Sequence, residues 1–275
     1  MRILLAGGAG QLGALLPRAL ADHEVVVPAR DRLDIADLAA VREVVRATRP
    51  QLVVNAAAYN RVDQAESDCE AAYRGNALGP RNLAIATAEV GIPVLHVSTD
   101  YVFDGRAGRA YHEYDATGPL SVYGASKLAG EEAIRGLNAR HYVVRTAWLY
   151  ATGHANFPTT MIGLGRRGPV RVVDDQVGSP TYAPHLASAI ARLVESGAFG
   201  TWHLAGSGAT NWHGLTRRLF ARLGIDSEVQ AVTTAAFPRP AARPAYSALV
   251  SIQDPPLALP PWEDGLDEFC RRVDP

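Results

Sequence analysis

A glycine-rich turn follows an apolar run at the start of the chain. Residues 3–6, Ile-Leu-Leu-Ala, are typical of a short buried strand, and three glycines follow at intervals of three residues: Gly7, Gly10 and Gly13. A turn free of Cβ atoms between a strand and a helix lets a pyrophosphate reach the backbone, where the first N–H groups of the helix stabilise the anion. The turn predicts a dinucleotide site, although glycine-rich turns also occur in loops that bind nothing.

The three glycines have separate tasks in such a site. We expect Gly7 to make the tight turn, Gly10 to let the phosphate approach, and Gly13 to allow close packing of the helix. The spacing G-x-x-G-x-x-G differs from the commoner G-x-G-x-x-G. The motif alone therefore leaves a turn without a ligand open.

Composition limits the class of protein. The 275 residues carry 27 Lys and Arg against 28 Asp and Glu, which gives a net charge of −1 and no reason to expect a nucleic-acid or membrane partner. Apolar runs are too short for a membrane span, and the start does not resemble a signal peptide. Cys69 and Cys270 have no companion His/Cys cluster, so we expect no metal site and a cytoplasmic location. Monomer and homodimer are both left open.

Strand-like and helix-like segments alternate through the first half of the chain. This order predicts an α/β fold with a doubly wound, parallel Rossmann-type sheet, covered by helices on both faces. The expected strands are residues 3–6, 24–28, 52–55, 93–98 and 142–146, and the expected helices are residues 11–22, 36–48, a long region ending at 90, and 123–135.

Beyond about residue 150 this rhythm loosens. Residues 1–150 are predicted to form the dinucleotide-binding domain, and residues 151–275 mainly a smaller, irregular C-terminal substrate lobe. Expected strands at 171–174 and 201–205 and a helix at 183–196 indicate that the segment 170–206 partly returns to the sheet. The proline-rich run 237–244 is expected to be extended and non-helical.

Tyr123 and Lys127 stand four residues apart in an expected helix, so they lie on one face about one turn apart. A nearby ammonium stabilises a phenolate and lowers the pKa of a tyrosine, which would make Tyr123 a usable acid or base. Such pairs also occur by chance, with a solvated lysine. Thr99 shifts the balance because it ends a strand at the expected ligand edge, where its hydroxyl can hold a carbonyl oxygen. A turn that caps the next element is the alternative for Thr99.

With these motifs in place, the sequence resembles the extended short-chain dehydrogenases/reductases and, more narrowly, the dTDP-4-dehydrorhamnose reductase family. The resemblance rests on Ser-Thr-Asp-Tyr-Val-Phe at 98–103, Tyr-Gly-x-x-Lys-x-x-Gly-Glu at 123–131 and Asp-Gln-x-Gly-x-Pro-Thr at 175–181. It implies reduction by NAD(P)H of the C4 ketone of a dTDP-linked 4-keto-6-deoxyhexose. By resemblance, Tyr123 is the general acid, Lys127 tunes it and binds the nicotinamide ribose, and Thr99 positions the sugar carbonyl.

The resemblance also implies two sets of binding residues. Those expected to face the cofactor are Gly7, Gly10, Gln11, Leu12, Gly13, Arg30, Asp34, Ile35, Ala56, Ala57, Ala58, Asn76, Tyr123 and Lys127. Those expected to face the substrate are Asn60, Val62, Thr99, Asp100, Tyr101, Tyr123, Trp148, Asn156 and Arg243. As alternatives, Trp148 packs the lobe and Arg243 is a solvated loop charge.

Two departures leave the substrate and the cofactor open. Asn60-Arg61 stands where the family commonly has Thr-Ala, so a related deoxysugar of secondary metabolism is an alternative substrate. Arg30 favours the 2′-phosphate of NADPH, whereas Asp31 or Asp34 could bond the ribose of NADH. Two other functions also stay open: nucleotide-sugar epimerisation, and a non-catalytic regulatory subunit like the β subunit of methionine adenosyltransferase.

Overall fold

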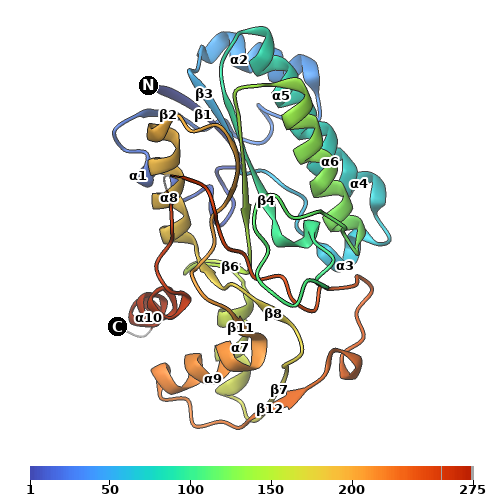
Figure 1. Cartoon of the computed structure of the whole chain (residues 1–275). Coiled ribbons are helices and arrows are strands. Elements are labelled where there is room, and N and C mark those ends of the chain that lie inside the picture. Colours follow the sequence, from blue (N-terminus) through green and yellow to red (C-terminus); the bar gives the residue numbers. More distant parts are fainter. Residues whose placement is uncertain (255, 274–275) are drawn as a thin grey trace.

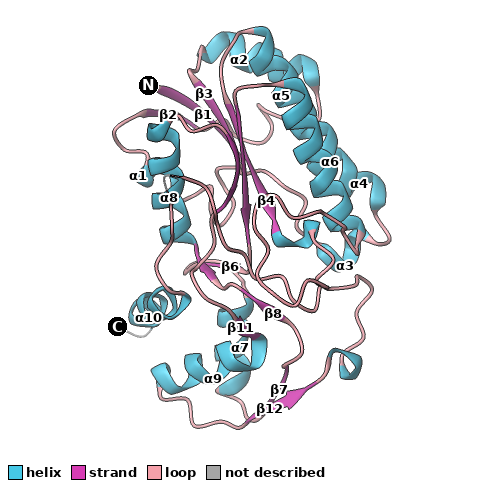
Figure 2. Cartoon of the chain, viewed as in Figure 1, coloured by secondary structure: helices cyan, strands magenta, loops and turns pink. Residues whose placement is uncertain are grey.

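A parallel sheet of six strands forms the centre of the molecule (Figures 1 and 2). The computed structural model describes residues 1–254 and 256–273. The strands lie in the order β10–β5–β4–β3–β1–β2, and every neighbouring pair runs parallel. In chain order they are β1 (Arg2–Ala6), β2 (Glu24–Val26), β3 (Leu52–Asn55), β4 (Val94–Thr99), β5 (His141–Thr146) and β10 (Gly200–His203). The predicted parallel α/β sheet is confirmed.

Both faces of the sheet are apolar, because successive side chains of a strand point to opposite sides. In β1, Ile3 and Leu5 join the core on one face, whereas Leu4 and Ala6 join the core on the other. The first face is covered by α1 (Leu16–Ala19) and α8 (Ala183–Ser196), and the second by α2 (Leu38–Thr48), α5 (Gly79–Glu89) and α6 (Val122–Leu137) (Figure 1).

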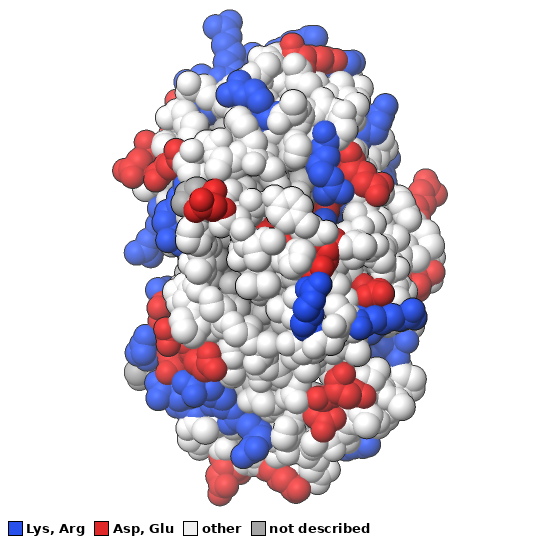
Figure 3. Space-filling view, viewed as in Figure 1, with Lys and Arg blue, Asp and Glu red and all other residues white. Residues whose placement is uncertain are grey.

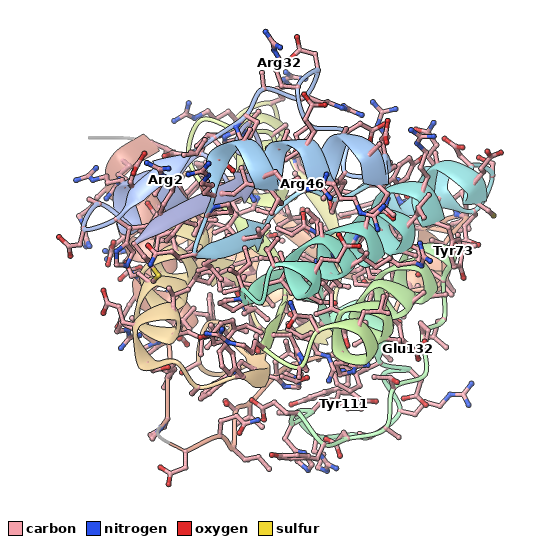
Figure 4. The ribbon with its side chains drawn as sticks, turned by 90° about the horizontal axis from the view of Figure 1, so that it is seen from above. Arg2, Arg32, Arg46, Tyr73, Tyr111 and Glu132 are labelled. Carbon is pink, nitrogen blue, oxygen red and sulfur yellow. The ribbon has the colours of Figure 1, made fainter. Side chains whose placement is uncertain are left out.

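Figure 4 shows the molecule from above, with Arg46 labelled on α2, Glu132 on α6 and Tyr73 at the end of α4 (Cys69–Tyr73). The expected long helix before residue 90 is divided there into α3 (Val62–Ala65), α4 (Cys69–Tyr73), the π-helix η1 (Arg74–Leu78) and α5. Pro80 explains part of this, because it has no N–H to bond the carbonyl of Asn76. Helix α6 packs closely against this point, because a Cβ on Gly130 would collide with the carbonyl oxygen of Asn76.

The expected helix at 11–22 is also shorter in the structure, where only Leu16–Ala19 is α-helical. The residues before it form hydrogen-bonded turns, such as the bond from the N–H of Leu15 to the carbonyl of Leu12. Pro17 cannot donate to the carbonyl of Gly13, so a regular helix cannot extend through this point.

The smaller lobe lies below the carboxyl edge of the sheet in Figure 1. Its core gathers residues from three helices, α7 (Phe157–Gly165), α9 (Trp212–Leu223) and α10 (Trp262–Val273). Short strands pair as β6 (Leu149–Tyr150) with β9 (Thr181–Tyr182), β7 (Val170–Val173) with β12 (Val229–Val232), and β8 (Val177–Gly178) with β11 (Thr210–Asn211). Single turns of 3₁₀-helix occur at η2 (Asp100–Val102) and η3 (Thr234–Ala236).

The segment 170–206 divides between the two parts of the molecule. The strand expected at 171–174 is β7, which pairs with β12 in the smaller lobe and not with the central sheet. The strand expected at 201–205 is β10, which pairs with β5 at the edge of that sheet. The run 237–244 contains no helix or strand, as its prolines predicted.

The described helices and the surface charges can be compared with the composition. Among residues 1–254 and 256–273, no helix combines the length and the apolarity that a bilayer crossing requires. Basic and acidic side chains are interspersed on the face shown in Figure 3. This distribution accords with the nearly neutral composition of the chain.

A buried ion pair fixes α6 to the sheet. The guanidinium of Arg145, on β5, contacts the carboxylate of Glu131, on α6, at 2.7 Å, and both side chains are almost completely buried. Arg135 adds a second pair to the same carboxylate at 2.9 Å. Because α6 carries Tyr123 and Lys127, this pair also holds the expected catalytic residues against the sheet.

We expect Arg145→Met to lower the free energy of unfolding by about 3–5 kcal/mol, because the carboxylate of Glu131 stays buried without its main partner. Urea denaturation measures the change. Arg42→Met is the matched control, since it breaks the exposed Arg42–Glu89 pair and should have little effect. Equal effects of the two substitutions would contradict the importance of the buried pair.

Candidate active site

The turn after β1 and the loop after β3 leave the sheet side by side. The chain goes from β1 to one neighbour, β2, and then crosses to the other neighbour, β3. In open parallel sheets, ligands bind at such a switch point, beyond the carboxyl ends of the strands. The two loops touch, because a Cβ added to Gly7 would collide with the backbone of Ala57. The topology thus brings the glycine turn next to Ala56, Ala57 and Ala58.

The glycines of the turn differ in what the fold requires of them. Gly7 has φ +83°, which favours glycine, and a Cβ on Gly13 would overlap the carbonyl oxygen of Gly7. Gly10 is exposed, and an added Cβ would lie 3.4 Å from the same oxygen, an ordinary contact. Packing therefore explains Gly7 and Gly13 but not Gly10. The bare backbone at Gly10 fits the close approach of a pyrophosphate.

Gln11 connects the glycine turn to the smaller lobe. Its Nε2 donates to the carbonyl of Leu149 at 3.0 Å, and its Oε1 accepts from Nδ2 of Asn156 at 3.1 Å. Asn156 also caps α7, where its Oδ1 accepts from the N–H of Thr159 at 3.1 Å. Both side chains are engaged within the protein. Contact of Gln11 with a cofactor and of Asn156 with a substrate stays a prediction.

Thr99, Asp100 and Tyr123 come together where β4 ends and α6 begins. The Thr99 hydroxyl donates to Oδ1 of Asp100 at 3.1 Å, and its hydrogen bonding with Tyr123 lowers the pKa of that phenol. Asp100 is buried, and its Oδ2 accepts from the hydroxyl of Ser247 at 2.6 Å. Burial raises the pKa of Asp100 to about 6, against the opposing effect of both hydroxyls.

The pKa of Tyr123 departs from the sequence prediction. Burial raises it to about 12, the hydrogen bond from Thr99 lowers it, and the charge of Asp100 raises it again. Lys127 was expected to lower this pKa, but in the structure desolvation of the phenol outweighs any such effect. A phenol that keeps its proton at neutral pH is in the form that a general acid requires.

Lys127 lies inside the protein, not in solvent. Its side chain is almost fully buried, and Nζ donates to the carbonyl of Val97 at 2.6 Å. Nζ also lies 3.3 Å from Nε2 of His96, which in turn is bonded to Asn55. Burial lowers the pKa of Lys127 to about 8, and the charge of Glu131 partly opposes this. The alternative interpretation of Lys127, as a solvated lysine on the helix surface, is therefore wrong.

An apolar cluster brings the expected sugar-facing residues together. Val62 and Tyr101 pack with Tyr123, and the rings of Tyr101 and Tyr123 meet edge to face with centroids 5.5 Å apart. Arg243 reaches this region from the C-terminal segment and forms two hydrogen bonds with Asp63 of α3, at 2.9 and 3.0 Å. Arg243 is thus a paired, half-buried side chain beside the cluster, and not a solvated loop charge.

Trp148 lies at the junction of the two parts. Its ring stacks on Trp212 with centroids 3.4 Å apart, and a Cβ on Gly178 would collide with the same ring. Its φ of +47° is strained for a bulky side chain. Trp148 therefore packs the lobe, and its partly exposed edge leaves the expected contact with a sugar as a prediction.

The loop after β2 holds the residues expected to meet the adenosine end. Asp34 is exposed and pairs with Arg74 at 2.6 Å, whereas Ile35 is buried. The backbone N–H of Ala36, together with Arg74 and Arg30, lowers the pKa of Asp34. Arg30 is exposed, and Figure 4 shows Arg32 of the same loop projecting away from the protein. The loop thus presents positive charge where a 2′-phosphate is expected.

Several expected side chains have structural tasks. Asn76 is buried, and its amide bonds the N–H and carbonyl of Tyr59 and the hydroxyl of Ser126. The side chain of Leu12 lies in the core, so only its backbone can face a ligand. Asn60 is exposed immediately before α3.

Three buried polar residues of this region are not among those predicted from the sequence: Asn55, His96 and Ser247. Asn55 and His96 carried a signal, because Asn55 ends an otherwise apolar strand and His96 lies between the apolar residues Leu95 and Val97. Ser247 carried none, since its contact with Asp100 spans 147 positions of the chain.

Comparison with known proteins identifies the family. A family model described as the RmlD substrate binding domain matches residues 1–274. The chain belongs to this family. The resemblance inferred from the motifs is confirmed, and the fold described above is that of an RmlD family member.

Relatives in the RmlD family match along nearly their whole length. The dTDP-4-dehydrorhamnose reductase of Streptomyces griseus is 43% identical, over 97% of this chain and 92% of that protein. Among solved structures, the dTDP-4-dehydrorhamnose reductase of Clostridium acetobutylicum has a TM-score of 0.96 and 38% identity, with 100% of both chains covered. The Bacillus anthracis enzyme of that name, solved in complex with NADP, has a TM-score of 0.95 and 37% identity, with 98% and 99% covered.

The glycine turn of this RmlD family member allows an effect on cofactor binding to be separated from an effect on stability. We expect Gly10→Ala to keep the free energy of unfolding but to weaken binding of the expected cofactor, NADPH, by about tenfold or more, because the added methyl blocks the phosphate. Gly13→Ala should lower both stability and binding, since its Cβ overlaps Gly7. Urea denaturation and calorimetric titration measure the two effects. If Gly10→Ala binds NADPH as tightly as the unsubstituted protein, the phosphate does not bind at this turn.

Proposed function

We propose that this protein reduces the C4 ketone of dTDP-4-dehydro-L-rhamnose with NADPH and gives dTDP-L-rhamnose. The observation that carries the proposal is the meeting of Thr99, Tyr123 and Lys127 beside a glycine turn at the switch point of the sheet. Relatives at about 40% identity that bear the name dTDP-4-dehydrorhamnose reductase support it.

The chain's own residues supply acid catalysis and alignment. Tyr123, protonated because it is buried, gives its phenolic proton to the sugar oxygen, while Thr99 holds that oxygen in place. Lys127, four residues further along α6, binds the ribose next to the nicotinamide. NADPH, when bound, supplies the hydride that completes reduction at C4. The buried cluster around Tyr101 and Tyr123 excludes water from the reacting carbonyl.

The two ends of the bound molecules meet different parts of the fold. Arg30, exposed after β2, pairs with the 2′-phosphate that distinguishes NADPH from NADH. On the other side, Arg243 is held by Asp63 within reach of the sugar nucleotide, so the C-terminal segment contributes to the substrate site. Asn60 and Arg61 are exposed at the entrance to α3 and contact the sugar.

Tyr123→Phe should reduce the rate of NADPH oxidation in the presence of dTDP-4-dehydro-L-rhamnose by about a hundredfold or more, because the proton donor is lost. Absorbance of the reduced nicotinamide measures the rate. Tyr114→Phe is the control, since Tyr114 is 73% exposed and should leave the rate unchanged. An unchanged rate in Tyr123→Phe would eliminate this mechanism.

The same assay separates the competing functions. A reductase consumes NADPH in proportion to product, whereas an epimerase leaves the cofactor unchanged overall. A panel of dTDP-linked 4-keto-6-deoxy sugars distinguishes the rhamnose precursor from a related deoxysugar. Absence of turnover with every sugar, together with a stoichiometric partner enzyme recovered from the source cell, would replace the proposal with a regulatory subunit.

A further inference from the structure

A chain of three buried polar side chains runs behind the catalytic helix. Asn55 ends β3, His96 lies within β4, and Lys127 reaches them from α6. Nδ2 of Asn55 lies 3.0 Å from Nδ1 of His96, and Nε2 of His96 lies 3.3 Å from Nζ of Lys127. Asn55 and His96 have no exposed surface, and Lys127 is only 2% exposed. Water therefore cannot compensate for a donor that faces another donor in these contacts.

The orientation of the Asn55 amide is settled by the backbone. Its Oδ1 accepts from the N–H of Ala57 at 3.0 Å, and a backbone N–H can only donate. The NH₂ group of Asn55 must therefore face His96, whose Nδ1 must accept. A neutral imidazole that accepts at Nδ1 carries its proton on Nε2. Burial and the charge of Lys127 lower the pKa of His96 far below its usual range, which agrees with a neutral ring.

This tautomer directs a donor at Lys127. An ammonium has three N–H donors and no lone pair, so it would face the Nε2–H of His96 as one donor faces another. A neutral amine fits the observed contacts, because it donates to the carbonyl of Val97 at 2.6 Å and accepts from His96. The N–H of Ala57 thus fixes the orientation of the Asn55 amide, and the amide fixes the tautomer of His96. His96 in turn places an N–H donor against Nζ of Lys127.

Few other charges face Lys127. Glu131, one turn further along α6, favours the ammonium. The carboxylate of Glu131 is already paired with Arg145 of β5 and with Arg135. From the start of α6, Tyr123 faces the same region with a neutral phenol. His96 of β4 is thus the side chain whose hydrogen-bond polarity opposes a charged Lys127.

We propose that His96 is a positioning residue for the reductase, fixed by Asn55 as its Nε2–H tautomer, and that it favours the neutral amine of Lys127. The catalytic consequence rests on the proposed function: the ammonium, which binds ribose and supports the phenolate left by Tyr123, loses its proton as the pH rises through about 8. The pair Asn55–His96 therefore sets the alkaline limit of activity.

The tautomer can be measured without substrate or cofactor. In the full-length protein labelled with ¹⁵N-histidine, two-bond ¹H–¹⁵N correlation spectra distinguish the Nδ1–H, Nε2–H and cationic forms, and loss of one ring signal in His96→Gln assigns it. At neutral pH we expect Nε2–H for His96. Observation of Nδ1–H or of a cationic ring would overturn the proposal, whatever the enzymatic activity proves to be.

Asn55→Asp reverses the polarity of the chain at constant size. One carboxylate oxygen keeps the bond from Ala57, while the other accepts from His96, so the ring carries its proton on Nδ1 and offers a lone pair to the Lys127 ammonium. We expect Nδ1–H or a cationic ring in the spectrum, and an alkaline limb of kcat/KM that moves up by about one pH unit. His96→Gln should also move the limb upward, because its amide can turn its oxygen to Nζ.

Asn138→Asp is the matched control for the pH profile. Asn138 is also buried, accepts at Oδ1 from the N–H two residues later, and donates from Nδ2 to Thr87 and Ile92. It should lower stability without moving the alkaline limb. If the limb stays in place in a folded Asn55→Asp or His96→Gln protein, or moves equally in Asn138→Asp, the proposal is wrong. A melting curve for each variant identifies those that fold.

Discussion

The ion pair between Glu131 and Arg145 holds the arrangement on which the active site depends. It fixes α6 to β5 inside the protein, and Arg135 adds a second ion pair to the same carboxylate. Lys127 and Tyr123 lie one and two turns before Glu131 on the same helix, so their depth relative to β4 follows from this attachment. The contact of Gly130 with the carbonyl of Asn76 sets the lateral packing of the same helix.

Desolvation then determines the protonation behaviour of the site. The same burial raises the pKa of Tyr123 to about 12, raises that of Asp100 to about 6 and lowers that of Lys127 to about 8. Each shift favours the neutral form, because a charge costs more in a low-dielectric interior than in water. Neighbouring groups oppose two of these shifts: the hydrogen bond of Thr99 lowers the pKa of Tyr123, and the charge of Glu131 raises that of Lys127.

Contacts between the two parts of the molecule complete the site from three directions. Gln11 connects the glycine turn to Leu149 and Asn156, and Arg243 connects the C-terminal segment to Asp63. Ser247 bonds Asp100, beside the reacting groups. The expected cofactor and substrate regions are therefore coupled by direct hydrogen bonds, and the smaller lobe has a defined position against the sheet.

The sequence by itself determined the parallel α/β sheet, the glycine turn, the place of Thr99 at a strand end and the spacing of Tyr123 and Lys127 on one helix face, because strand periodicity, glycine spacing and helical i, i+4 geometry are local properties. It did not determine the direction of the Tyr123 pKa shift or the division of the helix before residue 90. Nor could it assign β7 to the smaller lobe or connect Asn55, His96 and Lys127. Those features depend on burial and on contacts between segments distant in the chain, which only the tertiary structure decided.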